Sequence, residues 1–132
     1  MIYLLDTNAV SRYLSDRPSR IEVRVAELSK SEVATCSIVE AELRFGLAKA
    51  GASQKRYARL DGFLQGVWIY DFDSAAAREY GRLRARLEAN GEVIGGNDLM
   101  IAAIALAHDL TLVTHNMGEF ARVTGLRVED WE

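Results

Sequence analysis

Short apolar runs alternate with helix-like patterns along the whole chain. The runs cover residues 2–5, 33–36, 67–70 and 110–114, with a weaker fifth near 126–128. Each is shorter than a typical helix and predicts a strand, and the first run, residues 2–5, is expected to be buried. Strands of this kind separated by helices predict an α/β sandwich around a mostly parallel sheet of about five strands.

The stretches between these runs have the apolar spacing and the end signals of helices. The predicted helices are residues 10–14, residues 20–29, a helix capped by Ser37 and stopped by Gly51, residues 54–64, a helix capped by Asp73 or Ser74 that ends at residues 90–91, and residues 98–108. In a parallel sheet, ligands bind outside the carboxyl ends of the strands. Asp6 and Asn116 both lie just past predicted strand ends, so we expect a site there.

Length and charge narrow the class of protein. A chain of 132 residues is predicted to form a single domain, residues 1–132. The net charge of −3 counts against a protein that coats nucleic acid, but a nuclease can keep its acids in one pocket and its arginines around the rim. No apolar run approaches a membrane span, and no signal peptide is evident. The lone Cys36, expected to be buried, suits the cytoplasm.

Glu42 is the most informative acid. On a helix, its neighbours three and four positions away are Ile38, Val39, Phe45 and Gly46. A carboxylate framed by these residues is predicted to line a cleft, or to pair with an arginine across the fold, because burying it alone costs several kcal/mol. Glu40 serves as a control, since Arg44 offers it an ordinary surface ion pair.

Asp6 and Asp98 each have a structural explanation as well as a functional one. Asp6 opens an Asp-Thr-Asn segment in which Asp6, Thr7 or Asn8 can cap the next helix. Asp98 is predicted to lie in the first helical turn, where the helix dipole favours an acid and would keep it ionised. An acid delivered by the end of a buried strand is also a common metal ligand. Either residue taken alone leaves the two explanations open.

The segment after the fourth run supplies a hydroxyl, an amide and a carboxylate in one turn. Thr114 is placed to bond Asp6 or a metal-bound water, and Asn116 to act as a neutral ligand or to orient one. Glu119 either completes the set of acids or pairs with Arg122.

The donor types select the metal. Carboxylate and amide oxygens suit Mg²⁺ or Mn²⁺, whereas zinc prefers histidine or cysteine. His108 and His115 have no partner at metal-ligand spacing in the sequence, and His108 is expected at a helix C-terminus. No serine triad, P-loop or dinucleotide fingerprint is present.

Two other classes of protein compete with a nuclease: a phosphatase that also starts with a strand and an aspartate, and a non-enzymatic domain with an incidental pocket of acids. A phosphatase of the haloacid dehalogenase kind would need a second aspartate two residues on, where this chain has Asn8. A receiver or scaffold domain would need a lysine after a late strand, and residues 114–116 supply none. The nuclease interpretation fits the acids better than either alternative.

Four motifs, in order, resemble the PIN-domain nucleases and, more narrowly, the VapC toxins of toxin–antitoxin pairs. They are Leu-Leu-Asp-Thr-Asn ending at Asn8, Val-Glu-Ala-Glu-Leu-Arg-Phe-Gly around Glu42, Asn-Asp-Leu-Met-Ile-Ala around Asp98, and Val-Thr-His-Asn ending at Asn116. The resemblance covers essentially the whole chain. It implies a three-layer α/β/α sandwich and an endoribonuclease that uses Mg²⁺ or Mn²⁺.

The resemblance also implies residue roles and partners. Asp6, Glu42 and Asp98 match the three invariant acids of the family, and Asn116 stands where many members have aspartate. Asp6 and Asp98 would bind the metal, with Glu42 and Asn116 reaching it directly or through water, and with Thr7, Asn8, Thr114 and Glu119 in support. The implied biology is translation arrest by RNA cleavage, including cleavage of the initiator tRNA anticodon loop as one substrate, until a VapB-type antitoxin blocks the site. The family usually forms homodimers and toxin–antitoxin hetero-oligomers, and it has no membrane partner.

Overall fold

The structure is a computed structural model that describes all residues from 1 to 132. Five strands alternate with seven α-helices and one 3₁₀ turn. In chain order they are β1 (Tyr3–Leu5), α1 (Thr7–Leu14), α2 (Arg20–Ala26), η1 (Lys30–Glu32), β2 (Val33–Cys36), α3 (Ser37–Ala50), α4 (Gln54–Gln65), β3 (Trp68–Tyr70), α5 (Ser74–Ala89), α6 (Gly96–Ala107), β4 (Thr111–Val113), α7 (Met117–Phe120) and β5 (Arg127–Glu129).

The strands form one parallel sheet in the order β3-β2-β1-β4-β5. Leu4 of the central strand β1 pairs with Ala34 of β2 on one side and with Leu112 of β4 on the other. All four neighbouring pairs run parallel. The predicted sheet is therefore confirmed, and it is more regular than expected because it contains no antiparallel strand.

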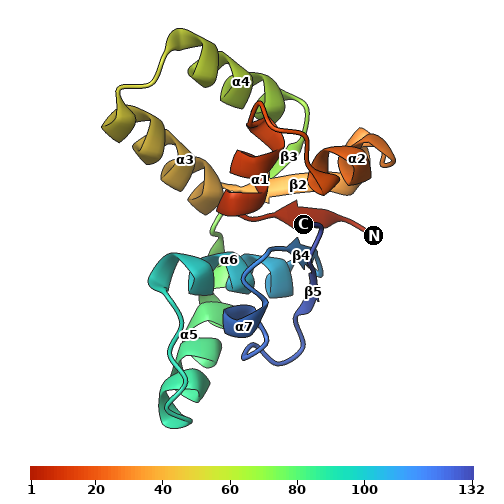
Figure 1. Ribbon diagram of the computed structural model, residues 1–132. Coiled ribbons are helices and arrows are strands. Elements are labelled where there is room, and N and C mark those ends of the chain that lie inside the picture. Colours follow the sequence, from red (N-terminus) through yellow and green to blue (C-terminus); the bar gives the residue numbers. More distant parts are fainter.

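Helices cover both faces of the sheet. Figure 1 shows α1 to α4 on one side of the strands and α5 to α7 on the other. The chain builds outward from β1 to β2 and β3, then returns to the other side of β1 to add β4 and β5. Because crossovers between parallel strands are right-handed, this reversal of direction sends the second set of helices to the opposite face. The predicted three-layer α/β/α sandwich is confirmed.

The core lies along the central strands and α6. Strands β1, β2 and β4 are buried throughout, and residues 101–105 of α6 are all buried, so this helix is enclosed on every side. Its tightest partner is α5, which packs along it. The edge strands are less covered, and Trp68 on β3 is 69% exposed. The positions near the middle of the sheet are consequently the most deeply buried.

Several helix ends differ from the sequence prediction. α1 begins at Thr7, three residues early, because the Asp6 side chain accepts a hydrogen bond from the Ala9 N–H and caps it. α3 is preceded by Cys36 in extended conformation, so Ser37 is its first helical residue and not its cap. α6 begins at Gly96 and α2 ends at Ala26. Asp73 does cap α5, as one of the two predicted alternatives.

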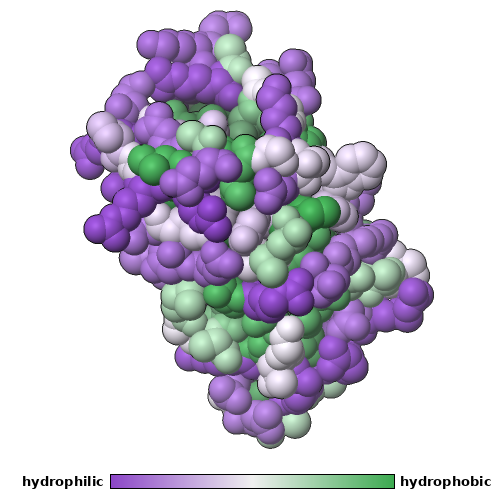
Figure 2. Space-filling view, turned by 90° about the vertical axis from the view of Figure 1, so that its right-hand side faces the viewer, coloured by the Kyte–Doolittle hydropathy of each residue, from purple (hydrophilic) through white to green (hydrophobic).

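The surface is mixed in character. Viewed from the side of the chain termini, hydrophilic residues cover much of the molecule and apolar residues gather in patches between them (Figure 2). None of the helices combines the length and apolar character needed to cross a membrane. Cys36 is buried and unpaired, as predicted, and its burial raises the pKa of the thiol to about 11.

Candidate active site

The candidate acids come together where the chain changes direction in the sheet. Asp6 directly follows β1, and Thr114 directly follows β4, the strand that pairs with β1 on the side where the later half of the chain is added. Asp98 and Glu42 are brought to the same edge by α6 and α3, which contact each other. This position, outside the carboxyl ends at a topological switch point, is the usual ligand-binding edge of such sheets.

Asp6 caps α1 and also lies at the candidate site. It is only 5% exposed, and its Oδ1 accepts the Ala9 N–H at 2.9 Å. Burial raises the pKa of its carboxyl, and hydrogen bonds from Thr114 and Ala9 oppose that rise. Thr114 therefore lies beside Asp6, and its hydroxyl favours the charged form of that carboxyl. The helix cap uses only Oδ1 of Asp6. The same residue can therefore cap α1 and still offer its other oxygen to a ligand, so the structural and the functional explanation of Asp6 are compatible.

Glu42 is held by neutral donors. Its Oε1 accepts the Thr7 hydroxyl at 2.5 Å, and its Oε2 accepts the Asn97 side-chain amide at 3.2 Å. No arginine pairs with it, so the alternative of an ion pair across the fold is wrong. The predicted frame is only partly apolar in space, because Phe45 is 65% exposed. Glu42 is half-buried and lines a cleft together with Thr7.

Glu40 behaves as the control predicted. Arg44 lies 2.8 Å from its Oε2 and also contacts Asp61 at 2.8 Å. Glu40 thus has the surface ion pair that Glu42 lacks, although the two residues are only two positions apart on α3. The contrast arises from helix geometry, which turns their side chains to different neighbours.

Asp98 carries the most strongly perturbed carboxyl of the site. Its burial, together with the negative charges of Glu119, Glu42 and Asp6, raises its pKa to about 6. The residue lies in the first turn of α6, as predicted. Desolvation and like charges outweigh the helix dipole, an effect of about 1 kcal/mol, so the dipole does not lower the pKa of Asp98, although a pKa of about 6 still leaves the carboxyl mostly ionised at neutral pH.

Glu119 joins the acids through α7. Its Oε1 accepts the Gly95 N–H at 2.6 Å, and its Oε2 accepts the Asn116 side-chain amide at 2.7 Å. It does not pair with Arg122, whose guanidinium donates instead to the carbonyl of Val93 at 2.7 Å. Of the two predicted alternatives for Glu119, the position beside the other acids is the one that the fold produces.

Asn116 connects Glu119 to the strand end. Its backbone N–H donates to the Thr114 hydroxyl at 3.0 Å while its side-chain amide holds Glu119. The amide oxygen of Asn116 has no partner within the chain and remains available as a neutral ligand. Asn8, by contrast, is exposed, and its side chain forms no hydrogen bond. It lines the pocket beside Thr7, together with Glu42.

Two residues of the site were missed from the sequence. Asn97 donates to Glu42, and Gly95 brings its backbone N–H to Glu119. A Cβ on Gly95 would lie 3.6 Å from the Glu119 carboxylate and 3.9 Å from the Asp98 carboxylate. The sequence placed both residues at the start of a helix, but it contained no signal for which acid each would meet.

The two histidines lie apart from the acids. His108 is the C-terminal cap of α6, as predicted, and its Nε2 lies 2.8 Å from Asp73. His115 has no partner at short sequence spacing, yet the fold brings Asp130 to 3.0 Å and Glu132 to 3.9 Å from its Nδ1. All three residues are exposed, where such groups commonly gather without an ion.

The electrostatics of the site favour a hard cation. None of Asp6, Glu42, Asp98 and Glu119 forms an ion pair with a lysine or arginine. Four clustered carboxylates with raised pKa values at two of them are destabilised by mutual repulsion and desolvation. Oxygen donors with this charge match a divalent ion of the magnesium type.

Comparison with known proteins identifies the family. The family model described as PIN domain matches residues 3–126. Ribonuclease VapC2 of Rickettsia felis is 40% identical over all of this chain and 99% of its own length. The tRNA(fMet)-specific endonuclease VapC of Salmonella typhimurium is 36% identical over 98% of this chain and 97% of its own.

The fold of this chain is also similar to that of a solved structure. The crystal structure of VapBC2 from Rickettsia felis, bound to a DNA fragment from its promoter, contains a chain that superposes with a TM-score of 0.92 at 39% identity, with each chain covered in full. Likeness at this level extends through the sheet, both helical layers and the strand ends where the acids lie. The chain therefore belongs to the PIN-domain family and, within it, to the VapC ribonucleases.

Proposed function

We propose that this protein is an Mg²⁺- or Mn²⁺-dependent endoribonuclease toxin in which Asp6, Glu42, Asp98 and Asn116 form the catalytic site. The observation that carries the proposal is the gathering of four carboxylates without a counter-charge at the strand ends, with burial and repulsion raising the pKa values of Asp6 and Asp98. A site that is costly to the fold and empty of arginine or lysine is explained by a cation that binds there.

Each residue has a distinct task in the proposal. Asp6 and Asp98 bind the ion, and Glu42 and Asn116 reach it directly or through water. Thr7 fixes the orientation of Glu42 through its hydroxyl bond. When bound, the ion neutralises the carboxylates and stabilises charge on the reacting phosphate.

The supporting residues act on the opposite side of the site. The Thr114 hydroxyl accepts the Asn116 backbone N–H and lies beside Asp6, so it positions two ligands relative to each other. Glu119 either binds the ion or, through its bonds to Gly95 and Asn116, orients the groups that do. Asn8 is placed to contact the substrate, since it is exposed beside Thr7.

The biological role in the proposal comes from the relatives. The Salmonella relative is named for its action on tRNA(fMet), and the Rickettsia structure is a VapBC complex. We infer that this chain, as a single PIN domain over residues 1–132, cleaves the anticodon loop of initiator tRNA in the cytoplasm and is inhibited by a VapB-type antitoxin. A homodimer within a toxin–antitoxin complex is the proposed assembly.

The proposal is tested by RNA cleavage with the purified protein. We expect cleavage of initiator tRNA in Mg²⁺ or Mn²⁺, none in EDTA, and a single 5′ end in the anticodon loop on sequencing. Asp6→Asn is the matched variant, because asparagine keeps the helix-capping oxygen while removing the charge. A folded Asp6→Asn protein that cleaves as fast as the native protein would contradict the mechanism.

A further inference from the structure

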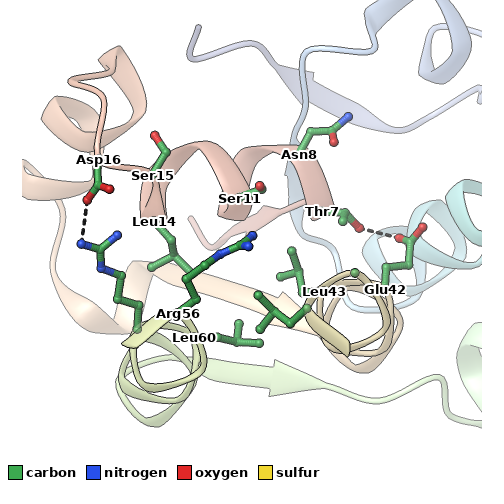
Figure 3. A pocket seen from close by; sticks show the side chains of 13 residues that line it. Thr7, Asn8, Ser11, Leu14, Ser15, Asp16, Glu42, Leu43, Arg56 and Leu60 are labelled. Carbon is green, nitrogen blue, oxygen red and sulfur yellow. Dashed lines mark hydrogen bonds and ion pairs between the residues drawn. The ribbon is translucent and has the colours of Figure 1, made fainter. Parts of the chain in front are cut away.

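A pocket of about 510 Å³ opens beside the acids between α1, α3 and α4. Thr7 and Glu42 form its inner end, and it extends from them toward the start of α4 (Figure 3). The lining residues are Thr7, Asn8, Ser11, Leu14, Ser15, Asp16, Glu42, Leu43, Gly46, Leu47, Arg56, Arg59 and Leu60. A ligand in this pocket would therefore lie next to the group that reacts at the carboxylates.

The walls of the pocket have two kinds of chemistry. α1 contributes the Ser11 hydroxyl and the apolar Leu14, with Asn8 at the rim, whereas α3 and α4 contribute leucines such as Leu43 and Leu60 (Figure 3). Hydroxyls and amides suit the hydrogen-bonding groups of a ribose or a base edge. An aliphatic wall suits the flat face of a base. The combination matches one nucleotide of an RNA strand.

The two arginines of the pocket are in different states. Arg59 is held by Asp16, with 2.6 Å between its Nη2 and the Asp16 Oδ1. The side chain of Arg56 forms no ion pair and no hydrogen bond within the chain, and in Figure 3 it reaches from α4 toward α1 across the pocket. Arg56 thus presents an uncommitted guanidinium, the group best shaped to bind a phosphate with two hydrogen bonds.

The position of Arg56 is not explained by helix stability. It lies with Lys55 in the first turn of α4, which contains no acidic residue. Cations are unfavourable at this end because the helix dipole is positive there. The same dipole adds to the positive potential of the two side chains, and this potential attracts an anion.

From these features we propose that the pocket is a subsite for the nucleotide next to the cleaved phosphodiester, and that Arg56 binds the phosphate of that nucleotide. The inference rests on the proposed nuclease function and adds a positioning residue outside the carboxylates. An RNA strand brings negative charge to four carboxylates, so a free cation beside them lowers the cost of its approach. Apolar contact with the leucines then orients the base.

The test measures RNA binding apart from cleavage. The probe is a fluorescein-labelled RNA hairpin with the initiator tRNA anticodon stem-loop sequence, titrated in EDTA at several salt concentrations. For Arg56→Ala we expect the Kd to rise about tenfold, as for the loss of one charged contact, and the slope of log Kd against log salt to fall by about 1. Arg56→Lys should recover only part of the affinity, because lysine keeps the charge but not the two-hydrogen-bond geometry. Unchanged Kd and slope in Arg56→Ala would overturn the proposal.

Arg78→Ala is the matched control. Arg78 is exposed on α5, on the opposite helical layer, and forms no ion pair, so its removal changes the net charge equally without touching the pocket. Kinetics under Mg²⁺ should show the loss in Arg56→Ala mainly in KM. If Arg56→Ala weakens only the complex with the antitoxin, the pocket holds a protein segment and the subsite is refuted. If the native protein neither binds nor cleaves RNA, the proposed function itself fails.

Discussion

The two sides of the site hold their carboxylates in different ways. On the side of α1 and α3, Asp6 and Glu42 accept hydrogen bonds from neutral donors, including the Ala9 N–H and the Thr7 hydroxyl. On the side of α6 and α7, Asp98 receives no N–H of its own and faces the charge of Glu119. Both carboxylates on the first side are thus held by neutral donors, whereas on the second side only Glu119 is held in this way and Asp98 faces its charge.

This difference shows that fixing the orientation of a carboxylate and neutralising its charge are separate tasks. Hydrogen bonds from neutral groups fix where a carboxylate points without removing its negative charge. The α1–α3 side therefore has defined geometry before any ion binds. The α6–α7 side supplies the repulsion that a divalent ion relieves, so we expect changes on the two sides to affect activity and stability differently.

The largest expected effect comes from the α1–α3 side. Glu42→Gln keeps the size of the side chain and one oxygen for Thr7 but removes the charge, so we expect cleavage to fall about a thousandfold or more while the fold is retained. Initial rates on initiator tRNA, with circular dichroism to check folding, measure this. Glu40→Gln on the same helix is the control, and it should lose no activity and less than about 1 kcal/mol of unfolding free energy. Unfolding of Glu42→Gln would instead make Glu42 a structural residue.

An intermediate effect is expected at α7, on the α6–α7 side. Asn116→Ala removes the donor that holds Glu119, and Glu119→Gln weakens the bond from the Gly95 N–H. We expect each variant to lose about 10- to 100-fold in metal affinity or activity, the range found for groups that orient metal ligands. Cleavage rates over a Mn²⁺ titration give both quantities. If both variants behave as the native protein, then α7 does not contribute to the site.

The smallest expected effect is on stability, and it has a pH dependence. The pKa of Asp98 in the fold, about 6, lies above its ordinary value of 3.8, so the protonated carboxyl favours the folded state. Its contribution to stability is full below pH of about 4 and is lost as the pH rises through about 6. Because Asp98 is half-exposed, solvent screening reduces the cost at neutral pH to about 1 kcal/mol.

Asp98→Asn removes the cost in stability of the charged Asp98 carboxylate, and it tests whether that cost is confined to the α6–α7 side. In EDTA we expect the variant to be more stable than the native protein by about 1 kcal/mol at pH 7.5, with the difference shrinking below pH 5. Urea unfolding at the two pH values measures it. Adding Mg²⁺ should stabilise the native protein and not the variant. Equal stability at pH 7.5 would show that the repulsion at Asp98 is negligible.

Much of the fold could be predicted because its signals are local. The apolar runs that became β1, β2 and β4 are buried on both faces, so their sequence needs no alternation with polar residues. Helix ends were less predictable. α1 begins early because the Asp6 side chain reaches a backbone N–H three residues on, and α7 is a single turn that periodicity cannot detect.

The sequence by itself determined the strands, the layers and which acids to suspect. Framing on a helix singled out Glu42, and motif order added Asp6, Asp98 and Asn116. The tertiary structure alone decided which groups meet. It gave Glu42 the amide of Asn97, and Glu119 the backbone of Gly95.

Only the tertiary structure, likewise, decided the direction in which the pKa of Asp98 is shifted. A pattern of residues reports what lies one helical turn away, and on that range the dipole of α6 predicts a lowered pKa. Its raised pKa follows from burial and from carboxylates on other segments of the chain. Desolvation and Coulomb repulsion depend on distances through space, and those distances exist only once the chain has folded.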